Sequence, residues 1–396
     1  MSQLLNIAIL GAGESGVGAA VLAQQLGHQV WVSDRGQISD AYTAVLDQYA
    51  IPYEQGQHSA DRILKADLVI KSPGIPDTAP LVAQLDAQGT PVIDELEWAS
   101  RHTDATVIAV TGSNGKTTTA KLIHHLLTTA GMDAGLAGNI GYSWAKQIAL
   151  DPKPYYVLEV SSFQLDRIQD FRPDIAVLLN ITPDHLDRYN YELDQFIASK
   201  LRLIKNATAE APMPFIYNGD DANIAKGMTD DWAPSHAAAA LRRLPISMAA
   251  LQQERDTLPV PHTDWVLDKA ELALMGQHNA FNMQCAALAA QLVGIEEAAL
   301  LEGLATFVNE PHRLERVLTL NGIPYINDSK ATNVDAVYWA LDAMTQPVVW
   351  IVGGVDKGND YHPLFDLVRQ KVRAIVCLGK DNEKIKTAFQ AIHEII

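Results

Sequence analysis

The sequence predicts an α/β protein with three domains, in which helices cover mainly parallel sheets. Short apolar runs alternate with amphipathic stretches along nearly the whole chain. Glycine-rich turns near Gly11, Gly112 and Gly353 each separate an apolar run from a helical stretch, and 396 residues are too many for one ordinary hydrophobic core. These turns predict a Rossmann-like domain at 1–98, a central P-loop-type domain at 99–309 and a third Rossmann-like domain at 310–396.

The individual elements follow from the period of the apolar residues. Strands are predicted at 5–10, 29–33, 68–71, 106–110, 155–160, 175–179, 348–352 and 374–378, where short apolar runs end at polar or glycine residues. Helical spacing predicts helices at 116–130, 279–292 and 334–343. Residues 228–262 are poorly patterned and rich in alanine at 237–240, so only a loose excursion from the sheet is expected there.

Charge and composition restrict the class of partner. The chain has 30 basic and 47 acidic residues, a net charge of −17, which disfavours nucleic acid and anionic membranes as partners. Cys285 and Cys377 are too few for a disulfide framework and predict reduced thiols. The N-terminus has no basic region, and no apolar run approaches the ~20 residues that cross a bilayer. A soluble, cytoplasmic monomer is expected.

The first glycine-rich loop, GAGESG at 11–16, follows a predicted strand and opens a helix. Glycines allow close approach to a diphosphate, and the helix N-terminus offers unpaired N–H groups. With Asp34 at the end of the next strand, this pattern by itself indicates NAD and a dehydrogenase, although such turns also occur for structural reasons. The segment SPG at 72–74 follows another strand and is expected at the same edge of the sheet as the first loop. Its glycine suits either close approach to a ligand or a plain turn.

The second glycine-rich loop, TGSNGKTT at 111–118, is the stronger signal. In such a loop successive backbone amides face phosphates, Lys116 supplies a point charge and the Thr117 hydroxyl is placed for Mg²⁺. Val110 stands where the usual pattern has its first glycine. Binding of a nucleoside triphosphate is therefore predicted, and it outweighs the dehydrogenase interpretation of the first loop.

The loop at 111–117 resembles the ATP loop of the Mur ligases and folylpolyglutamate synthases. Further matches follow in the family order: EVSSFQ at 159–164, NITPDHLD at 180–187, Lys200, GQHN at 276–279, His312-Arg313 and DSKATN at 328–333. The SSFQ and DSKATN segments are similar to those of D-glutamate-adding Mur ligases. The resemblance implies an ATP-dependent carboxylate–amine ligase that joins D-glutamate to UDP-N-acetylmuramoyl-L-alanine through an acyl phosphate, in cytoplasmic peptidoglycan precursor synthesis.

The resemblance also implies a site for ATP with two Mg²⁺ ions. The residues that it assigns to ATP are Gly112, Ser113, Asn114, Gly115, Lys116, Thr117, Thr118, Asn279, Asn282, Arg313 and Asp328. Those that it assigns to metal are Thr117, Glu159, His185 and Lys200. A carboxylate at a strand end suits Mg²⁺, whereas chemistry alone favours a hydrogen-bonding role for His185. Asn279 could instead cap a helix, and Glu159 could instead cap a loop. Asp187 is interpreted as a residue that orients its loop.

Lys200 lies in a helical stretch where a solvated lysine is the usual interpretation. The resemblance implies instead that its amine reacts with CO₂ to form a carbamate, an anionic oxygen ligand for the second metal ion. Carbamylation requires the neutral amine, so the pKa of Lys200 would have to be lowered by burial or by nearby cations. Lys205, which lies outside the motif, is interpreted as a surface lysine.

Further residues are assigned to the two substrates and to catalysis by resemblance. The UDP-substrate residues are Ser15, Gly16, Asp34, Arg35, Ser72, Gly74 and Asn139, and the D-glutamate residues are Lys330, Thr332 and Lys357. The catalytic residues are Lys116, His185, Lys200, Arg313 and Lys330. A surface ion pair with Asp34 explains Arg35 equally well.

The family pattern continues beyond Ile396 with a strand–helix pair and a Ser-Pro loop. A third sheet without them is expected to expose apolar surface, and this chain to ligate D-glutamate poorly. Three alternatives remain. They are a folylpolyglutamate-type ligase, an NAD-dependent dehydrogenase that would leave Lys116 and Glu159 without a role, and a non-catalytic nucleotide-binding regulator.

Overall fold

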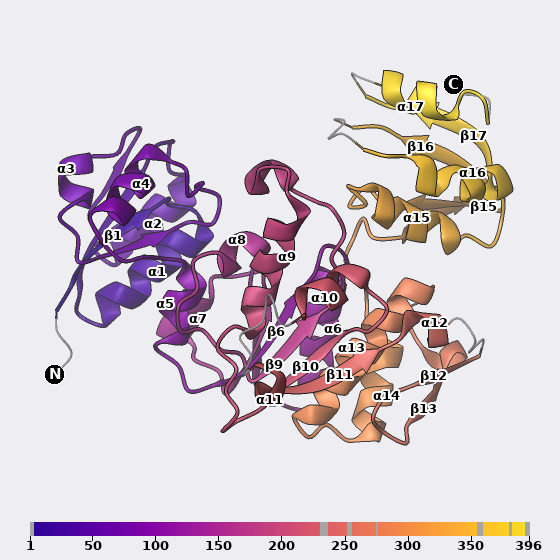
Figure 1. The fold of residues 1–396 in the computed structure, drawn as a ribbon, viewed down its shortest axis with the longest axis horizontal. Coiled ribbons are helices and arrows are strands. Elements are labelled where there is room, and N and C mark those ends of the chain that lie inside the picture. The colour runs from indigo at the N-terminus through magenta and orange to yellow at the C-terminus, as the bar shows by residue number, and fades with distance from the viewer. Residues whose placement is uncertain are drawn as a thin grey trace.

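The computed structural model describes residues 4–229, 237–251, 256–274, 276–354, 359–379 and 382–392. Figure 1 shows three bodies along the long axis: an N-terminal one in indigo, a central one that runs from purple through magenta to orange, and a C-terminal one in light orange and yellow. All the predicted strands and helices are present, with ends shifted by at most two residues. Within the described ranges, no helix is long and apolar enough to cross a membrane.

The N-terminal body is built on a parallel sheet in the order β3-β2-β1-β4-β5. Its strands are β1 (Asn6–Leu10), β2 (Gln29–Asp34), β3 (Tyr53–Gln55), β4 (Leu68–Lys71) and β5 (Val92–Ile93), and its helices are α1 (Glu14–Gln25), α2 (Asp40–Gln48), α3 (Ala60–Ile63), α4 (Pro80–Ala87) and α5 (Glu95–Ser100). The strand order reverses between β1 and β4, where open α/β sheets bind ligands beyond their carboxyl ends. The loops at 11–16 and 72–74 follow these two strands.

The central body has a six-stranded parallel sheet in the order β11-β10-β9-β6-β8-β7. Its strands are β6 (Thr106–Thr111), β7 (Ala134–Gly138), β8 (Tyr155–Glu159), β9 (Ile175–Leu178), β10 (Met213–Asn218) and β11 (Leu241–Ile246). Its helices include α6 (Lys116–Thr129), α7 (Trp144–Leu150), α8 (Ser162–Leu165), α9 (Leu193–Leu201), α10 (Ala222–Gly227), α13 (Gln277–Leu292) and α14 (Glu297–Thr306). The carboxyl ends of β6, β8 and β9 meet at one edge, which brings the predicted motifs together.

The expectation of a loose excursion at 228–262 is wrong for the part that is described. β11 pairs in parallel with β10 and buries Leu241, Leu244 and Ile246 against the central core. The pattern was hidden by two exposed arginines and by Pro245, because an edge strand is hydrogen-bonded on one side only and tolerates proline. Beyond it, β12 (Thr257–Pro259) and β13 (Val266–Asp268) form an antiparallel pair.

The first two bodies share one hydrophobic core, whereas the third has its own. A continuous cluster of buried apolar residues extends from the first sheet to one face of the central sheet, where α7 packs against α1 and α5. The opposite face of the central sheet is covered by α6 and α13. The core of the C-terminal body, which includes Leu341, Val368, Ile375 and Phe389, is a separate cluster.

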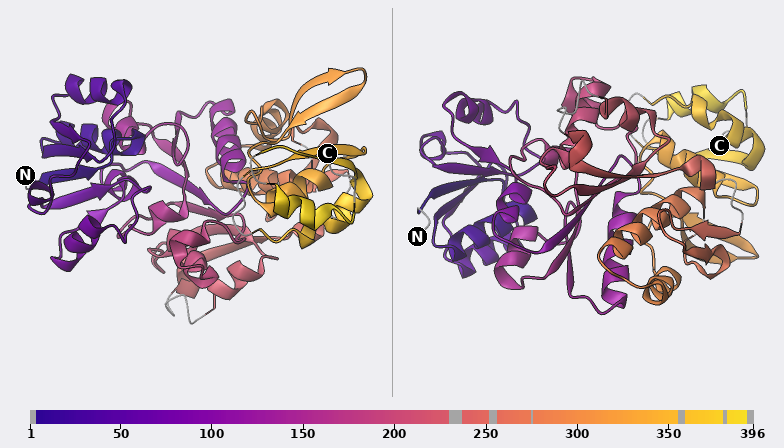
Figure 2. Two further views of the ribbon diagram at one scale, coloured as in Figure 1. Left: turned by 90° about the horizontal axis from the view of Figure 1, so that it is seen from above. Right: turned by 60° about the horizontal axis from the view of Figure 1, so that its bottom comes forward.

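The C-terminal body contains a hairpin and a parallel strand pair. Its elements are β14 (Glu315–Leu320), β15 (Ile323–Asn327), α15 (Val334–Asp342), β16 (Val348–Val352), α16 (Phe365–Lys371), β17 (Val372–Cys377) and α17 (Glu383–Phe389). The β14–β15 hairpin, in orange, projects from the rest of the molecule in the left view of Figure 2. Apolar side chains are exposed on these strands, among them Val317, Leu320, Ile323, Val349 and Ile351.

Candidate functional site

The phosphate loop connects β6 to α6 and passes very close to α13. Gly115, which precedes the first residue of α6, has φ 86°, a conformation that glycine adopts readily. A Cβ at this position would lie 2.7 Å from Oδ1 of Asn282 and 3.2 Å from Leu179. Both the backbone conformation and the close packing therefore require glycine at 115.

Lys116 folds back onto this loop. Its Nζ donates to the carbonyls of Gly112 and Ser113, at 2.8 Å each. Burial lowers the pKa of Lys116, and the carboxylates of Glu159 and Asp184 act against that shift. The ammonium thus lies where phosphate oxygens would replace the loop carbonyls as its acceptors.

Asn180, from the NITPDHLD segment, supports the loop from the neighbouring strand end. Its Oδ1 accepts the N–H groups of Ser113 at 3.0 Å and of Asn114 at 2.8 Å, and its Nδ2 donates to the Asn114 carbonyl at 3.0 Å. The expectation that successive loop amides all face phosphates is therefore wrong for these two. The N–H groups of the first turn of α6, which no helical carbonyl can accept, remain the candidates for phosphate contact.

Replacing Asn180 with alanine should weaken the loop. We expect the free energy of unfolding to fall by ~1–3 kcal/mol and the Kd for ATP to rise about tenfold, because the Asn114 N–H loses its acceptor and the Ser113 N–H keeps only the backbone carbonyl of residue 180. Denaturant unfolding and calorimetry would measure both effects. Asn206→Ala is the matched control, since Asn206 also donates to two backbone carbonyls, of Gln169 and Phe171, far from the loop. Equal ATP affinity in the two variants would contradict the proposed support.

Glu159 lies at the end of β8, beside the phosphate loop as predicted. Its side chain is only 2% exposed. Its Oε1 accepts a hydrogen bond from Asn139 at 2.8 Å, whereas its Oε2 is buried and has no hydrogen-bond partner in the described part of the chain. A buried carboxylate oxygen without a partner is costly unless a cation compensates it, so the residue fits a Mg²⁺ ligand. Asn139, assigned to the UDP substrate, thus also lies beside the candidate metal ligand.

Lys200 lies on α9 and is 2% exposed, so its interpretation as a solvated lysine is wrong. Its Nζ is 3.4 Å from Oγ1 of Thr111 and 4.9 Å from the centroid of the Phe196 ring. Burial, and next the charge of Lys116, hold the pKa of Lys200 well below its usual range. A lowered pKa is the direction that carbamylation of Lys200 would require. Lys205 is exposed, as predicted.

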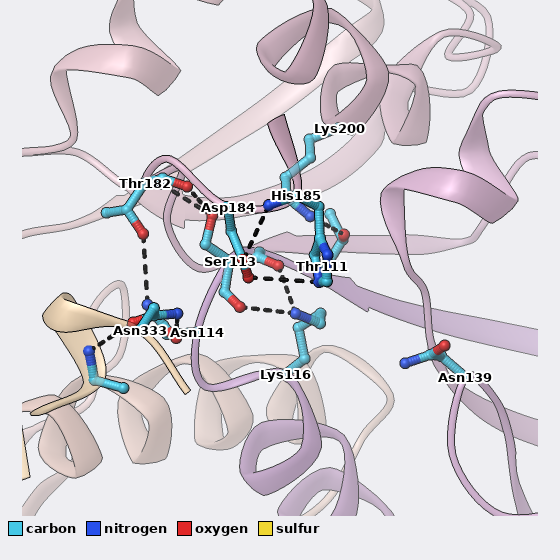
Figure 3. A network of polar contacts seen from close by, with 12 residues as sticks. Thr111, Ser113, Asn114, Lys116, Asn139, Thr182, Asp184, His185, Lys200 and Asn333 are labelled. Atoms are coloured by element: carbon cyan, nitrogen blue, oxygen red, sulfur yellow. Dashed lines mark hydrogen bonds and ion pairs between the residues drawn. The ribbon is translucent and has the colours of Figure 1, made fainter. Parts of the chain in front are cut away.

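His185 lies in an exposed loop between β9 and α9. Its backbone has φ 51°, its ring is 5.5 Å from that of Phe163, and its Nε2 is 3.7 Å from the Asp184 carboxylate. Figure 3 shows His185 and Asp184 in the same cluster as Lys116 and Lys200. Burial is the largest cause of the lowered pKa of both Lys116 and Lys200, and the negative charge of Asp184 acts against it.

Asp184 was not predicted as a site residue. An acidic residue directly before the motif histidine was the available signal. Asp187, by contrast, is exposed. Among the described residues, no three His, Cys, Asp or Glu side chains form a ready-made metal cluster.

A cleft between α13 and the C-terminal body extends from the phosphate loop. Its volume is about 100 Å³, smaller than the ~300–1,000 Å³ typical of small-molecule sites. Asn279 and Asn282 line it from α13 and are both 4% exposed. Capping does not explain Asn279, because Gly276 occupies the N-cap of α13. Thr118 lines the cleft and lies 3.4 Å from Asn309.

The C-terminal body closes the other side of this cleft. Arg313 donates from Nη2 to Oγ1 of Thr117 at 3.1 Å, and its Nε has no hydrogen-bond partner in the described ranges. Asp328 accepts the Leu314 N–H at 3.0 Å, and burial raises its pKa. Arg313 therefore reaches the phosphate loop directly, while Asp328 lines the cleft farther from it.

Two further residues of the cleft were missed by sequence analysis. Asp335 accepts a hydrogen bond from Nδ2 of Asn114 at 2.7 Å, and the ring of Trp339 lies 6.3 Å from that of His278. Burial lowers the pKa of His278 to about 4, so this ring is neutral at physiological pH. Helical periodicity places Asp335 and Trp339 on one face of α15, but which body that face meets is decided by the tertiary structure.

The residues assigned to D-glutamate are only partly assembled. Lys330 is half-exposed and pairs with Glu310 at 3.3 Å, and Glu310 also pairs with Lys121 of α6. Thr332 is exposed. Lys357 lies outside the described residues.

The residues assigned to the UDP substrate gather at the first sheet. Ser15 and Gly16 lie in the first turn of α1. The Asp34 carboxylate accepts the N–H groups of Ala12 and Gly36, at 2.7 Å each. Asp34 therefore holds the loop after β1 and the loop after β2 by hydrogen bonds. Within the described residues, no ion pair joins Asp34 to the exposed Arg35.

The loop after β4 closes this candidate UDP site. Gly11 has φ 93°, and a Cβ there would lie 2.4 Å from Oγ of Ser72. This close contact brings the two loops of the first sheet together. Gly74 is exposed, and its carbonyl accepts a hydrogen bond from Arg188 of the central body.

Comparisons with known proteins agree with this arrangement. The Mur ligase MurD-like N-terminal domain matches residues 5–94, the Mur ligase middle domain residues 110–290, and the Mur ligase glutamate ligase domain residues 312–395. The chain belongs to the Mur ligase family. A UDP-N-acetylmuramoylalanine–D-glutamate ligase of Christiangramia forsetii is 47% identical to it, over 97% of this chain and 86% of the relative. The corresponding ligase of Porphyromonas gingivalis is 48% identical over the same shares.

Solved structures show the same fold at lower sequence identity. The UDP-N-acetylmuramate–alanine ligase of Thermotoga maritima matches with a TM-score of 0.59 and 17% identity, over 99% of this chain and 90% of that one. A type C pseudomurein peptide ligase of Methanothermus fervidus matches with a TM-score of 0.60 and 17% identity, over 99% and 88%. The α/β architecture predicted from the sequence is thus confirmed as that of the Mur ligases.

Proposed function

We propose that this chain is an ATP-dependent ligase that joins D-glutamate to UDP-N-acetylmuramoyl-L-alanine in peptidoglycan precursor synthesis in the cytoplasm. The observation that carries the proposal is the meeting of Lys116, Glu159 and Lys200 at one sheet edge, in a chain 47% identical to a D-glutamate ligase. Neither an NAD-dependent dehydrogenase nor a folylpolyglutamate-type ligase accounts both for this group of three residues and for the similarity to D-glutamate ligases. The net charge of −17 also suits a small-molecule enzyme better than a nucleic-acid-binding protein.

In the first step, a carboxylate oxygen of the UDP substrate attacks the γ-phosphorus of ATP, an acyl phosphate forms and ADP leaves. The approach of two anions requires cationic groups, which Lys116 and Arg313 supply at the phosphate loop. Thr117, Glu159, His185 and carbamylated Lys200 would hold two Mg²⁺ ions. These ions would add positive charge and polarise phosphate oxygens.

In the second step, the amine of D-glutamate attacks the acyl carbon. A tetrahedral intermediate forms and loses inorganic phosphate, leaving the new amide, while the amine gives up a proton. Lys330 and Thr332 are proposed to receive the two carboxylates of D-glutamate together with Lys357. Lys330 would have to leave Glu310, with which it pairs at 3.3 Å, in order to bind a carboxylate of D-glutamate.

The UDP moiety is proposed to lie at the first sheet. The first turn of α1, with Ser15 and Gly16, offers N–H groups to its diphosphate. Asp34, Arg35, Ser72 and Gly74 lie at the carboxyl ends of strands of the same sheet, and Asn139 is proposed to contact the substrate from the central body. This arrangement leads the substrate from the first sheet toward the phosphate loop.

The chain is proposed to form three domains with boundaries near residues 98 and 309, and to act as a monomer. The core shared by the first two domains would fix their relative position, whereas the third has a separate core. Polar contacts of the third domain end on the phosphate loop: Asn114 bonds to Asn333 at 2.9 Å and to Asp335 at 2.7 Å. ATP would disturb these contacts, so the third domain is the one expected to move.

Small-angle scattering would detect this movement. We expect the radius of gyration to fall when a non-hydrolysable ATP analogue and the UDP substrate are added together, because both ligands join surfaces of different domains. Arg313→Ala should reduce the change, since Arg313 is the third-domain cation at the phosphate loop. Scattering curves that stay the same with both ligands would contradict the hinge near residue 309.

Phosphate release identifies the amino acid that is ligated. With ATP and UDP-N-acetylmuramoyl-L-alanine present, D-glutamate should stimulate release above every other amino acid in a panel that includes L-glutamate, L-alanine and meso-diaminopimelate. The comparison holds whatever the absolute rate is, because only the amine differs. Release that requires a folate and L-glutamate instead would support the folylpolyglutamate alternative.

A further inference from the structure

Arg188 connects the central domain to the loop at the candidate UDP site. It lies in the 3₁₀ turn η1 (Leu186–Tyr189), which begins directly after His185. Its Nη1 donates to the Gly74 carbonyl and its Nη2 to the Pro73 carbonyl, both at 3.2 Å. One planar guanidinium thus holds two successive carbonyls of the loop that follows β4.

The same guanidinium lies on an aromatic ring that also contacts His185. Cζ of Arg188 is 4.3 Å from the centroid of the Phe163 ring, and the His185 ring meets that ring edge-on at 5.5 Å. Phe163 belongs to α8, which begins shortly after the strand that ends at Glu159. A cation over an aromatic face is favourable, so Phe163 orients Arg188 while it packs against the imidazole.

The turn itself is anchored from the other side. Tyr189 is 6% exposed and stacks on Phe163 at 6.2 Å. Its hydroxyl donates to the Asp166 carboxylate at 3.0 Å and lies 3.2 Å from Oγ of Ser199, the neighbour of Lys200. Arg188 therefore projects toward the first domain from a turn that is fixed to α9.

We infer that Arg188 is a positioning residue that sets the distance between the UDP-substrate loop at 72–74 and His185. The inference rests on the proposed function, in which the substrate extends from the first domain to the phosphate loop. Other contacts also hold these domains together, for example Arg167 with Asp77 and Asp86, at 2.9 Å each. Arg188 differs because it contacts a candidate substrate loop and the ring that packs on a candidate metal ligand.

Calorimetry with two ligands would separate positioning from general support of the interface. Arg188→Ala should weaken binding of UDP-N-acetylmuramoyl-L-alanine about tenfold, because this ligand must fit both domains at once. The Kd for UDP alone should stay within about twofold, because UDP would need only the first domain. Arg167→Ala serves as the matched control and should leave both affinities unchanged even if it lowers stability.

Two further measurements test the chemistry of the guanidinium. Arg188→Lys should recover only part of the affinity, because an ammonium cannot bond both carbonyls in the fork geometry of arginine. Millimolar guanidinium should restore substrate affinity to Arg188→Ala and have no such effect on Arg167→Ala. A merely structural loss would not respond to the free cation.

Hydrogen exchange without ligands tests the connection independently of function. Segments 72–75 and 183–187 should both exchange faster in Arg188→Ala, and not in Arg167→Ala. Unchanged exchange in these segments, equal loss of UDP and full-substrate affinity, or the same affinity losses in Arg167→Ala would overturn the inference. If the unsubstituted chain does not bind the UDP substrate while the exchange result holds, the proposed function fails and the domain connection stands.

Discussion

Replacing Lys116 with alanine is expected to abolish ATP turnover, with ADP formation reduced by about a thousandfold or more. Lys116 is the cation of the phosphate loop, and preorganised charge at a transferring phosphoryl group is the main source of catalysis in this chemistry. Binding of UDP-N-acetylmuramoyl-L-alanine should survive, because its proposed UDP contacts lie on the first sheet.

ADP formation in the presence of the UDP substrate measures the first effect, and calorimetry with that substrate measures the second. Lys226→Ala is a suitable control, since Lys226 forms an exposed ion pair with Asp194 away from the loop. A variant at Lys116 that loses both ligands to the same extent would contradict the assignment of two separate sites.

Replacing Lys200 with alanine should remove activity to a similar extent, by about a thousandfold. The proposed carbamate forms when the neutral amine attacks CO₂, so that a C–N bond forms and a proton leaves. Because burial and the charge of Lys116 lower the pKa of Lys200, the neutral amine is available at pH values where an exposed lysine is protonated. The variant loses the anionic oxygen ligand, so its response to Mg²⁺ should be impaired.

Labelled CO₂ offers a direct test of this chemistry. A carbamate carbon signal should appear in the unsubstituted chain and be absent from Lys200→Ala, and short carboxylates such as acetate should partly restore activity to the variant. Lys205→Ala, at an exposed lysine shortly after α9, should behave like the unsubstituted chain. A normal Mg²⁺ response in Lys200→Ala would rule out the oxygen-ligand role.

The sequence by itself predicted the strands and helices named above and the candidate motifs, because both are local. The strands that carry the motifs have apolar runs, and the phosphate loop has its glycines and Lys116 within a few residues. β11 was not predicted, because Pro245 interrupts its local pattern. It forms a strand because it pairs with β10, a contact that a local pattern does not show.

Only the tertiary structure decided the environment of each motif. Burial changes Lys200 from a surface lysine into an amine with a lowered pKa, and a neighbouring strand end supplies Asn180 to the phosphate loop. Asp335 and Arg188 reach their partners 221 and 114 residues away along the chain. Such contacts follow from the packing of whole domains, and burial and pKa depend on the surrounding atoms, which no short stretch of sequence specifies.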